Sequence, residues 1–215
     1  MTKDYGIFLG VSLISTQFFS KKCINNYARW ALQHYRRFLI VIADTGELIN
    51  WITLKKISYE EASERIQYRV NCLIKGYKKA IITYEDVDIL RMSSIVLNDD
   101  YETIYKLIKD EYSINKHFRE RVNATIANNI GGLLASLELG NQILKKLSPY
   151  IFHELAVSIY LKWFNKPSYP SQVSPSKDAL MIDVLSGNLT DVISKLKLKS
   201  EEYEYIIKDC HEGYK

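Results

Sequence analysis

The chain has 215 residues, 47% of them hydrophobic and 12% aromatic, which fits a globular protein with one well-buried core and leaves little room for a second domain. Its formal net charge of +4 is only mildly basic, so the distribution of charge matters more than the sum. No apolar stretch is long enough to span a membrane and the first residues lack a secretory signal, so we expect a cytoplasmic protein. Cys23, Cys72 and Cys210 are odd in number and far apart, which predicts free thiols rather than a disulfide framework or a zinc site.

Two apolar strands and the helix between them predict the fold class. Residues 5–11 and 38–44 are continuous apolar segments, typical of strands buried on both faces. Ser20 is a suitable N-cap for a helix over residues 21–35. This β-α-β order indicates an α/β fold with a Rossmann-like, doubly wound and mostly parallel sheet of about five strands. Ligands of such sheets bind at the carboxyl ends of the strands, where the hydroxyl-rich loop 10–20 begins.

A long amphipathic helix is predicted over residues 58–81, opened by a capping-box pair at Ser58 and Glu61. Its outer side carries few acidic residues after the first turns and gathers five basic residues, Arg65, Arg69, Lys75, Lys78 and Lys79. A charged outer face is usually just solvated. The alternative is a ridge that binds the phosphates of a nucleic acid.

The middle of the chain predicts a third strand near 88–92 and helices over about 99–112 and 115–139, with no internal repeat or linker. One domain over residues 1–215 is therefore expected. Near the end of the chain, residues 201–209 indicate a closing strand.

Residues 147–171 contain the second group of candidate functional residues. Ser148 followed by proline predicts a helix start, which would place Tyr150 and Glu154 on one helical face near the positive end of the helix dipole. A carboxylate among apolar neighbours is either paired or functional, because burying it alone is costly. His153 has no metal-ligand partner at useful spacing and is interpreted as a core or surface histidine.

Taken together, these features resemble the cyclodipeptide synthases over nearly the whole chain. The matching elements are Gly-x-Ser at the end of the first strand, Trp-Ala in the first helix, the "VIAD" strand end, the basic helix, Tyr-x-x-x-Glu and a later Tyr-Pro pair. The resemblance implies a fold like the catalytic domain of class I aminoacyl-tRNA synthetases. It also implies an aminoacyltransferase that joins two aminoacyl groups from charged tRNAs into a cyclic dipeptide, a 2,5-diketopiperazine.

The resemblance assigns roles to four residues. Ser12 matches the nucleophile, which would carry the aminoacyl and then the dipeptidyl group as an ester in a ping-pong reaction. Tyr150 and Glu154 match the pair that holds the substrate amino group, with Glu154 carrying the proton. Tyr169 matches the tyrosine implicated in the final cyclisation.

Further positions carry over to substrate binding. Phe8, Gly10 and Val157 match the pocket for the first aminoacyl group, and the bulk of Phe8 predicts a small first residue such as alanine or glycine. Ser15 and Pro170 point to the branch of the family in which proline follows the late tyrosine. The five basic residues of the 58–81 helix match or extend the tRNA-binding face of the family.

The same resemblance implies no cofactor, neither ATP nor a metal, because the aminoacyl ester of a charged tRNA is already activated. Two aminoacyl-tRNAs are the expected partners, with no membrane partner and a monomeric chain. Two alternatives stay open. A synthetase-like nucleotide-binding domain would need a His-Ile-Gly-His element, which this sequence lacks, and a non-catalytic RNA-binding protein would leave Ser12, Tyr150, Glu154 and Tyr169 without a reason to converge.

Overall fold

The computed structural model describes residues 3–13, 18–130, 140–198 and 204–210. At its centre is a five-stranded parallel sheet in the order β3-β2-β1-β4-β5. The strands are β1 (Lys3–Val11), β2 (Tyr35–Ile42), β3 (Val87–Arg91), β4 (Ser171–Ser174) and β5 (Glu204–Ile207). The α/β class and the parallel sheet of about five strands are therefore confirmed.

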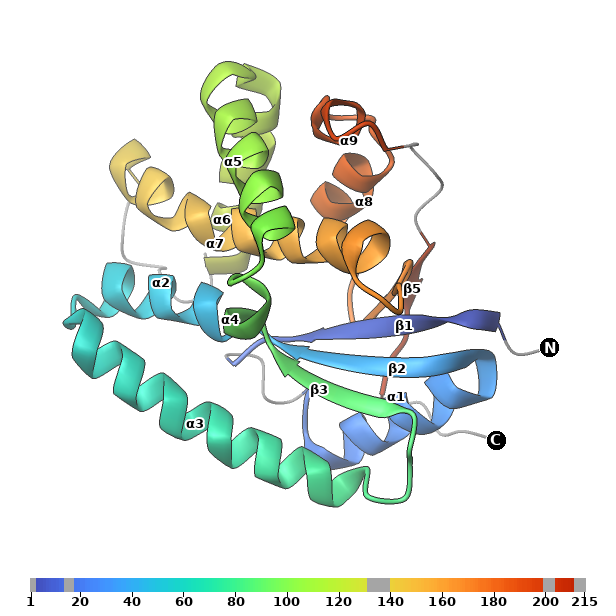
Figure 1. Cartoon of the computed structure of the whole chain (residues 1–215). Helices are drawn as coiled ribbons and strands as arrows, with labels where there is room; N and C mark the ends of the chain where they lie inside the picture. The colour runs from blue at the N-terminus through green and yellow to red at the C-terminus, as the bar shows by residue number, and fades with distance from the viewer. Residues whose placement is uncertain (1–2, 14–17, 131–139, 199–203, 211–215) are drawn as a thin grey trace.

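Helices cover both faces of this sheet (Figure 1). On one side lie α1 (Lys21–His34) and α3 (Tyr59–Ala80). The larger layer on the other side contains α5 (Asp99–Ile114), α6 (Lys116–Ile130), α7 (Asn141–Ile159), α8 (Ala179–Leu185) and α9 (Val192–Lys195). The remaining helical segments are α2 (Asp44–Lys55), which packs against both α3 and α7, the short α4 (Met92–Ile95) and a π-helical turn over Tyr160–Phe164.

The central strand β1 shows why a continuous apolar segment was the correct signal. Successive side chains of a strand point to opposite faces. Ile7 and Leu9 pack into the core under α1, whereas Phe8 packs into the core of the α5–α8 layer, and all three are buried. Both faces of β1 are covered, so neither set of positions is polar.

The two predicted helix starts are confirmed. The Ser20 hydroxyl accepts a hydrogen bond from the Cys23 amide at 3.2 Å, and Ser58 accepts one from the Glu61 amide at 3.2 Å. Each bond satisfies a backbone donor that the first turn of a helix leaves unpaired.

The predicted helix start at Ser148 and Pro149 is wrong. The helix α7 begins at Asn141 and runs through Pro149. Proline lacks the amide that would bond the carbonyl of Lys145 four residues earlier, and the Ser148 hydroxyl donates to that carbonyl at 3.0 Å instead. Tyr150 and Glu154 thus lie in the middle of a helix, away from the positive end of its dipole.

Two further expectations needed correction. Residue 44 is not part of the second strand, because Asp44 begins α2, a helix that was not predicted. Cys23 and Cys210 are not free thiols but form a disulfide, with Cα atoms 5.0 Å apart. The end of the chain returns over α1, where the Asn26 amide group also donates to the Cys210 carbonyl at 2.9 Å. Cys72 is a free, exposed thiol, as predicted.

The predicted strands near 88–92 and 201–209 correspond to β3 and β5, and the helices over 99–112 and 115–139 correspond to α5 and to α6 up to residue 130. Residues 131–139 lie outside the described part of the chain. Within the described ranges, no helix has the length and apolar character needed to cross a membrane.

Candidate active site

A cavity of about 560 Å³ opens at the carboxyl ends of β1 and β4. β1 pairs with β2 on one side and with β4 on the other, so the chain reverses its direction of winding at this point of the sheet. Such a switch point leaves a crevice between diverging connections, which is where ligands of open α/β sheets bind.

Six of the residues named from the sequence line this cavity together: Phe8, Gly10, Ser12, Tyr150, Glu154 and Val157. Phe8 and Gly10 belong to β1 and Ser12 directly follows it, and the other three are spaced by four and three residues on one face of α7. The structure thus brings together two sequence segments that lie about 140 residues apart, at the edge of the sheet predicted for a ligand.

Ser12 is half-buried and directly follows β1. The last residue of that strand, Val11, accepts a hydrogen bond from the Ala43 amide at 3.0 Å, which ties the end of β1 to the start of α2. The backbone that carries the Ser12 hydroxyl is therefore fixed at the cavity wall.

Burial dominates the electrostatics of Tyr150 and Glu154. Burial, together with the nearby charge of Asp178, raises the pKa of Glu154 to about 8. No described residue donates a hydrogen bond to the Glu154 carboxyl group. Burial also raises the pKa of Tyr150, whose hydroxyl accepts a hydrogen bond from the Asn129 side-chain amide at 3.0 Å. Glu154 is therefore a carboxyl group that can take or release a proton near neutral pH.

Several residues of the cavity wall were missed by the sequence analysis, namely Glu47, Asn129, Gln172, Ser174, Asp178 and Tyr205. Asp178 accepts a hydrogen bond from the Met181 amide at 3.0 Å and so caps α8. The signal was present in the sequence, since an aspartate precedes the apolar run "ALMIDVL". The other residues carry no local pattern that marks them.

Tyr169 and Pro170 lie away from the cavity. Tyr169 precedes β4, and its buried ring packs against Gly6 near the amino end of β1. Gly6 is six residues before Ser12, or about 20 Å along a strand. The expectation that Tyr169 and Pro170 join Ser12 is therefore not met. Tyr169 and Pro170 precede β4 whereas Ser12 follows β1, and because β1 and β4 are parallel these positions lie at opposite ends of the two strands. Ser15 lies outside the described residues.

This placement makes Tyr169 a packing residue of the sheet, which a glycine substitution can test. A methyl group at Gly6 would overlap the Tyr169 ring, and the ring is too buried to move aside easily. We expect Gly6→Ala to destabilise the protein by about 1–3 kcal/mol, a fall in Tm of about 2–4 °C for each kcal/mol.

The control for this melting experiment is Gly10→Ala, because a methyl group at Gly10 meets no atom within 4 Å. Equal melting temperatures of the two variants would show that the ring does not pack on Gly6.

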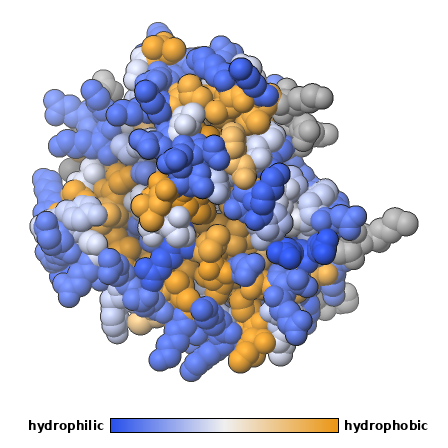
Figure 2. All heavy atoms as spheres, viewed as in Figure 1, coloured by the Kyte–Doolittle hydropathy of each residue, from blue (hydrophilic) through white to orange (hydrophobic). Residues whose placement is uncertain are grey.

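The basic face of α3, formed by Arg65, Arg69, Lys75, Lys78 and Lys79, is only partly free of acidic partners. Arg65 pairs with Glu61 at 2.7 Å, and Arg69 is half-buried and opposes the rise in the pKa of Glu47. The three lysines are exposed. Figure 2 shows hydrophilic residues along the rim of the molecule where α3 lies, with apolar residues gathered nearer the middle of the same view.

A second cavity of about 210 Å³ connects this helix with the site. It is lined by Ser12, by Phe19, Ser20 and Lys21 at the start of α1, and by Cys72, Leu73, Gly76 and Tyr77 of α3. Ser12 thus lies between the large cavity and a smaller one bounded by α3. Among the residues described, no group of three or more His, Cys, Asp or Glu side chains is arranged to hold a metal ion.

The cyclodipeptide synthase family model matches residues 2–160 of this chain. No curated protein matches it. A solved cyclodipeptide synthase from Staphylococcus haemolyticus superposes with a TM-score of 0.74 at 18% identity, over 95% of this chain and 90% of that one. A second, from Candidatus Glomeribacter gigasporarum and bound to Phe-tRNAPhe, gives a TM-score of 0.61 at 12% identity, over 100% and 92%.

A Mycobacterium tuberculosis protein, whose structure relates cyclodipeptide synthetases to type I tRNA synthetases, superposes with a TM-score of 0.63 at 15% identity, over 85% of this chain and 77% of that one. At these identities the likeness shows a shared fold. The expected similarity to the class I synthetase catalytic domain is confirmed at that level.

Proposed function

Because the chain belongs to the cyclodipeptide synthase family, we propose that it joins two aminoacyl groups, taken from two aminoacyl-tRNAs, into a 2,5-diketopiperazine. The observation that carries this proposal is the single cavity that Ser12, Tyr150 and Glu154 line together. A hydroxyl nucleophile in the same cavity as a carboxyl group of raised pKa suits acyl transfer from an activated ester.

In the first step the Ser12 oxygen attacks the ester carbonyl of an aminoacyl-tRNA. A new ester forms on Ser12, the bond to the tRNA ribose oxygen breaks, and the hydroxyl proton ends on that oxygen. One ester replaces another, so this step needs no nucleotide and no metal.

In the second step the amine of the Ser12-bound group attacks the ester of a second aminoacyl-tRNA. An amide bond forms, the bond to the ribose oxygen of the second tRNA breaks, and a proton from the attacking nitrogen ends on that oxygen. Tyr150 and Glu154 hold the reacting amino group, and Glu154 takes the proton that the ammonium group must lose before it can attack. The free amine of the dipeptide then attacks the Ser12 ester, which closes the ring and restores the serine hydroxyl.

Phe8 and Gly10 lie close to Ser12 in the sequence, Val157 lies close to Glu154, and all three line the cavity. We propose that they form the pocket for the first aminoacyl side chain. A small first residue stays a prediction, as do the branch indicated by Ser15 and Pro170 and the monomeric state. The cytoplasm, where charged tRNA is made, is the proposed location. No role in cyclisation is proposed for Tyr169, given where its ring lies.

The direct test is mass spectrometry of the medium and extract of cells that express the protein. A cyclic dipeptide that is absent from cells with empty vector supports the proposal. Purified protein that binds tRNA or nucleotide but forms no cyclic dipeptide from a full set of aminoacyl-tRNAs would contradict it.

The basic face of α3 gives a separate prediction about tRNA binding. Lys78 and Lys79 are exposed at the end of the helix, on the element that bounds the smaller cavity beside Ser12. Each phosphate that a lysine neutralises releases counterions and adds to the salt dependence of binding. We expect Lys78→Ala with Lys79→Ala to weaken aminoacyl-tRNA binding and to reduce the salt slope by about one to two.

The matched control removes two exposed lysines from the opposite layer, Lys106 and Lys109 of α5. Thermal stability should change little in either pair, because exposed charges contribute about 0–1 kcal/mol. The Cys72 thiol, exposed on α3, adds a footprint, since bound tRNA should slow its alkylation. Equal affinity and equal salt slope in both double variants would show that tRNA docks elsewhere.

A further inference from the structure

We propose that Asp178 is a second carboxylate of the amine-binding site, acting with Glu154 on the ammonium group of the aminoacyl substrate, and that Tyr205 positions it. This inference rests on the proposed function. Both residues line the cavity that contains Ser12, Tyr150 and Glu154. Both also follow residue 160, where the match to the family model ends.

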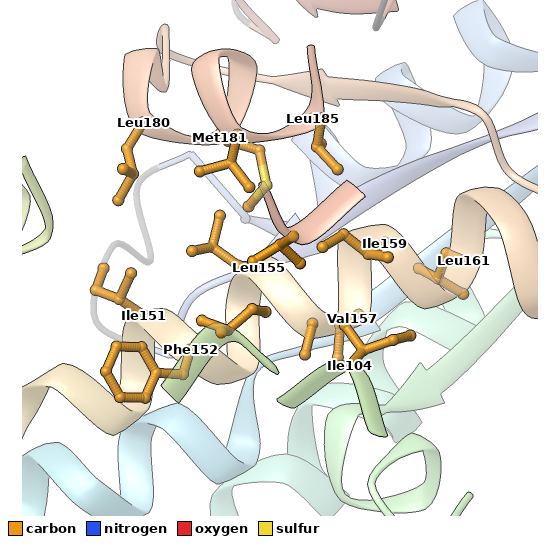
Figure 3. Packing of buried hydrophobic residues seen from close by; sticks show 14 of the residues in the cluster. Ile104, Ile151, Phe152, Leu155, Val157, Ile159, Leu161, Leu180, Met181 and Leu185 are labelled. Carbon is orange, nitrogen blue, oxygen red and sulfur yellow. The ribbon is translucent and has the colours of Figure 1, made fainter. Parts of the chain in front are cut away.

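The position of Asp178 is fixed relative to Glu154 by packing between two helices. Asp178 caps α8 through its hydrogen bond from the Met181 amide. Figure 3 shows Leu180, Met181 and Leu185 of α8 pointing toward the side chains of α7, the helix that carries Glu154. Because α8 and α7 share one core cluster, the Asp178 carboxyl group is held over the same cavity as Glu154.

The residue Tyr205 fixes the loop that leads to Asp178. Tyr205 lies on β5 opposite Gln172 of β4, and its hydroxyl donates to the Ser176 carbonyl at 3.0 Å. The loop between β4 and α8 is thus braced from the neighbouring strand. Tyr205 acts on the reaction through this loop, as a positioning residue.

The two carboxyl groups influence one another's protonation. The charge of Asp178 contributes to the raised pKa of Glu154, and burial raises the pKa of Asp178 itself. Two half-buried carboxylates whose pKa values are raised in one cavity are not both favoured as anions near neutral pH unless a cation is bound. An ammonium group is a cation of this kind, and each substrate of the proposed reaction carries one.

Other titratable and charged groups face the same space, namely Glu47 of α2, Arg121 of α6, Tyr150 of α7, Lys177 beside Asp178, and Tyr205 of β5. Arg121 is paired with Asp183 of α8 at 2.6 Å, so its charge is already balanced. Glu47 is a further acidic residue of the cavity wall. It lies on α2, where its carboxyl group accepts a hydrogen bond from the Trp51 indole.

The proton balance of the step is simple. The ammonium group transfers one proton to a carboxylate of the pair and becomes the amine that attacks the second ester. As the amide forms, the nitrogen loses a second proton, which ends on the ribose oxygen that leaves with the tRNA, and the pair releases the first proton to solvent. The second carboxylate keeps a hydrogen bond to the amino group while the first is protonated.

Asp178→Asn separates this role from capping, because asparagine caps a helix as well as aspartate does. We expect the rate of cyclic dipeptide formation to fall at least about tenfold, which is less than the roughly 10²–10⁴-fold effect of a principal general acid or base because Glu154 remains. We also expect the midpoint of the pH dependence of amide formation to move to lower pH, because the charge that raises the pKa of Glu154 is gone. The measurement is single-turnover conversion of aminoacyl-enzyme, quenched at short times between about pH 6 and 9.

Three further variants complete the test. Asp191→Asn removes an exposed carboxylate at the start of α9 and should leave both the rate and the midpoint unchanged. Asp178→Glu keeps a carboxylate at this position, so its pH midpoint should lie closer to that of wild type than the midpoint of Asp178→Asn does. Tyr205→Phe should give a smaller loss of rate than Asp178→Asn, since it only loosens the loop.

If Asp178→Asn turns over like wild type with the same midpoint, Asp178 is only a helix cap and the inference is overturned. If this variant does not fold, Asp178→Ser, which also supplies a capping oxygen, gives the same comparison. A wild-type protein that makes no cyclic dipeptide would instead overturn the proposed function, before any variant is compared.

Discussion

Ser12→Ala is expected to abolish cyclic dipeptide formation, with a loss of at least about a thousandfold. The alanine side chain has no oxygen to accept the aminoacyl group, and the proposed reaction has no route that avoids this ester. Wild type incubated with one kind of aminoacyl-tRNA should gain the mass of one aminoacyl group on the Ser12 peptide, and the variant should gain none.

Binding and folding separate this result from a structural defect. Ser12→Ala should bind aminoacyl-tRNA and melt like wild type, because the substitution removes one oxygen from a half-buried residue at a cavity. Ser94→Ala is the matched control, since that exposed hydroxyl donates to the nearby Arg91 carbonyl and does not line the cavity. Product formed by Ser12→Ala at the wild-type rate would exclude the covalent mechanism.

Glu154→Gln is expected to have the second largest effect, a loss of about a hundredfold or more in turnover. Glutamine keeps the shape of the side chain but cannot take a proton from the ammonium group. Aminoacyl-enzyme should therefore form and then accumulate, which intact-protein mass spectrometry would detect. Normal turnover of the variant would reduce Glu154 to a structural neighbour of Tyr150.

The same substitution predicts a change in stability with pH, whose sign follows from the raised pKa of Glu154. A carboxyl group whose pKa is higher in the folded than in the unfolded protein destabilises the fold progressively as pH rises from about 4.5 to about 8. Glutamine does not titrate, so this part of the pH dependence should vanish. Thermal melts at low pH should agree, and above about pH 8 the variant should be the more stable protein.

The sequence by itself determined the features that depend on local pattern. Continuous apolarity identified β1 and β2 as strands covered on both faces, and serine spacing identified the capped starts of α1 and α3. Helical spacing put Tyr150 and Glu154 on one face, and strand order put Ser12 at the ligand-binding edge. These properties are set by residues a few positions apart, so one sequence suffices to read them.

Local pattern misled at two places. Ser148 and Pro149 have the pattern of a helix start, yet the Ser148 hydroxyl satisfies the Lys145 carbonyl and lets α7 continue. Tyr169 has the sequence context of a site residue, but its place before β4 puts it at the far edge of the sheet.

Only the tertiary structure brought the late part of the chain to the cavity. The parallel pairing of β4 with β1 and of β5 with β4 places Asp178 and Tyr205 beside Glu154, and the return of the chain over α1 joins Cys23 to Cys210. The partners in each case are separated by at least 24 residues. No helical or strand period links such positions, because their proximity follows from the order of strands in the sheet rather than from spacing along the chain.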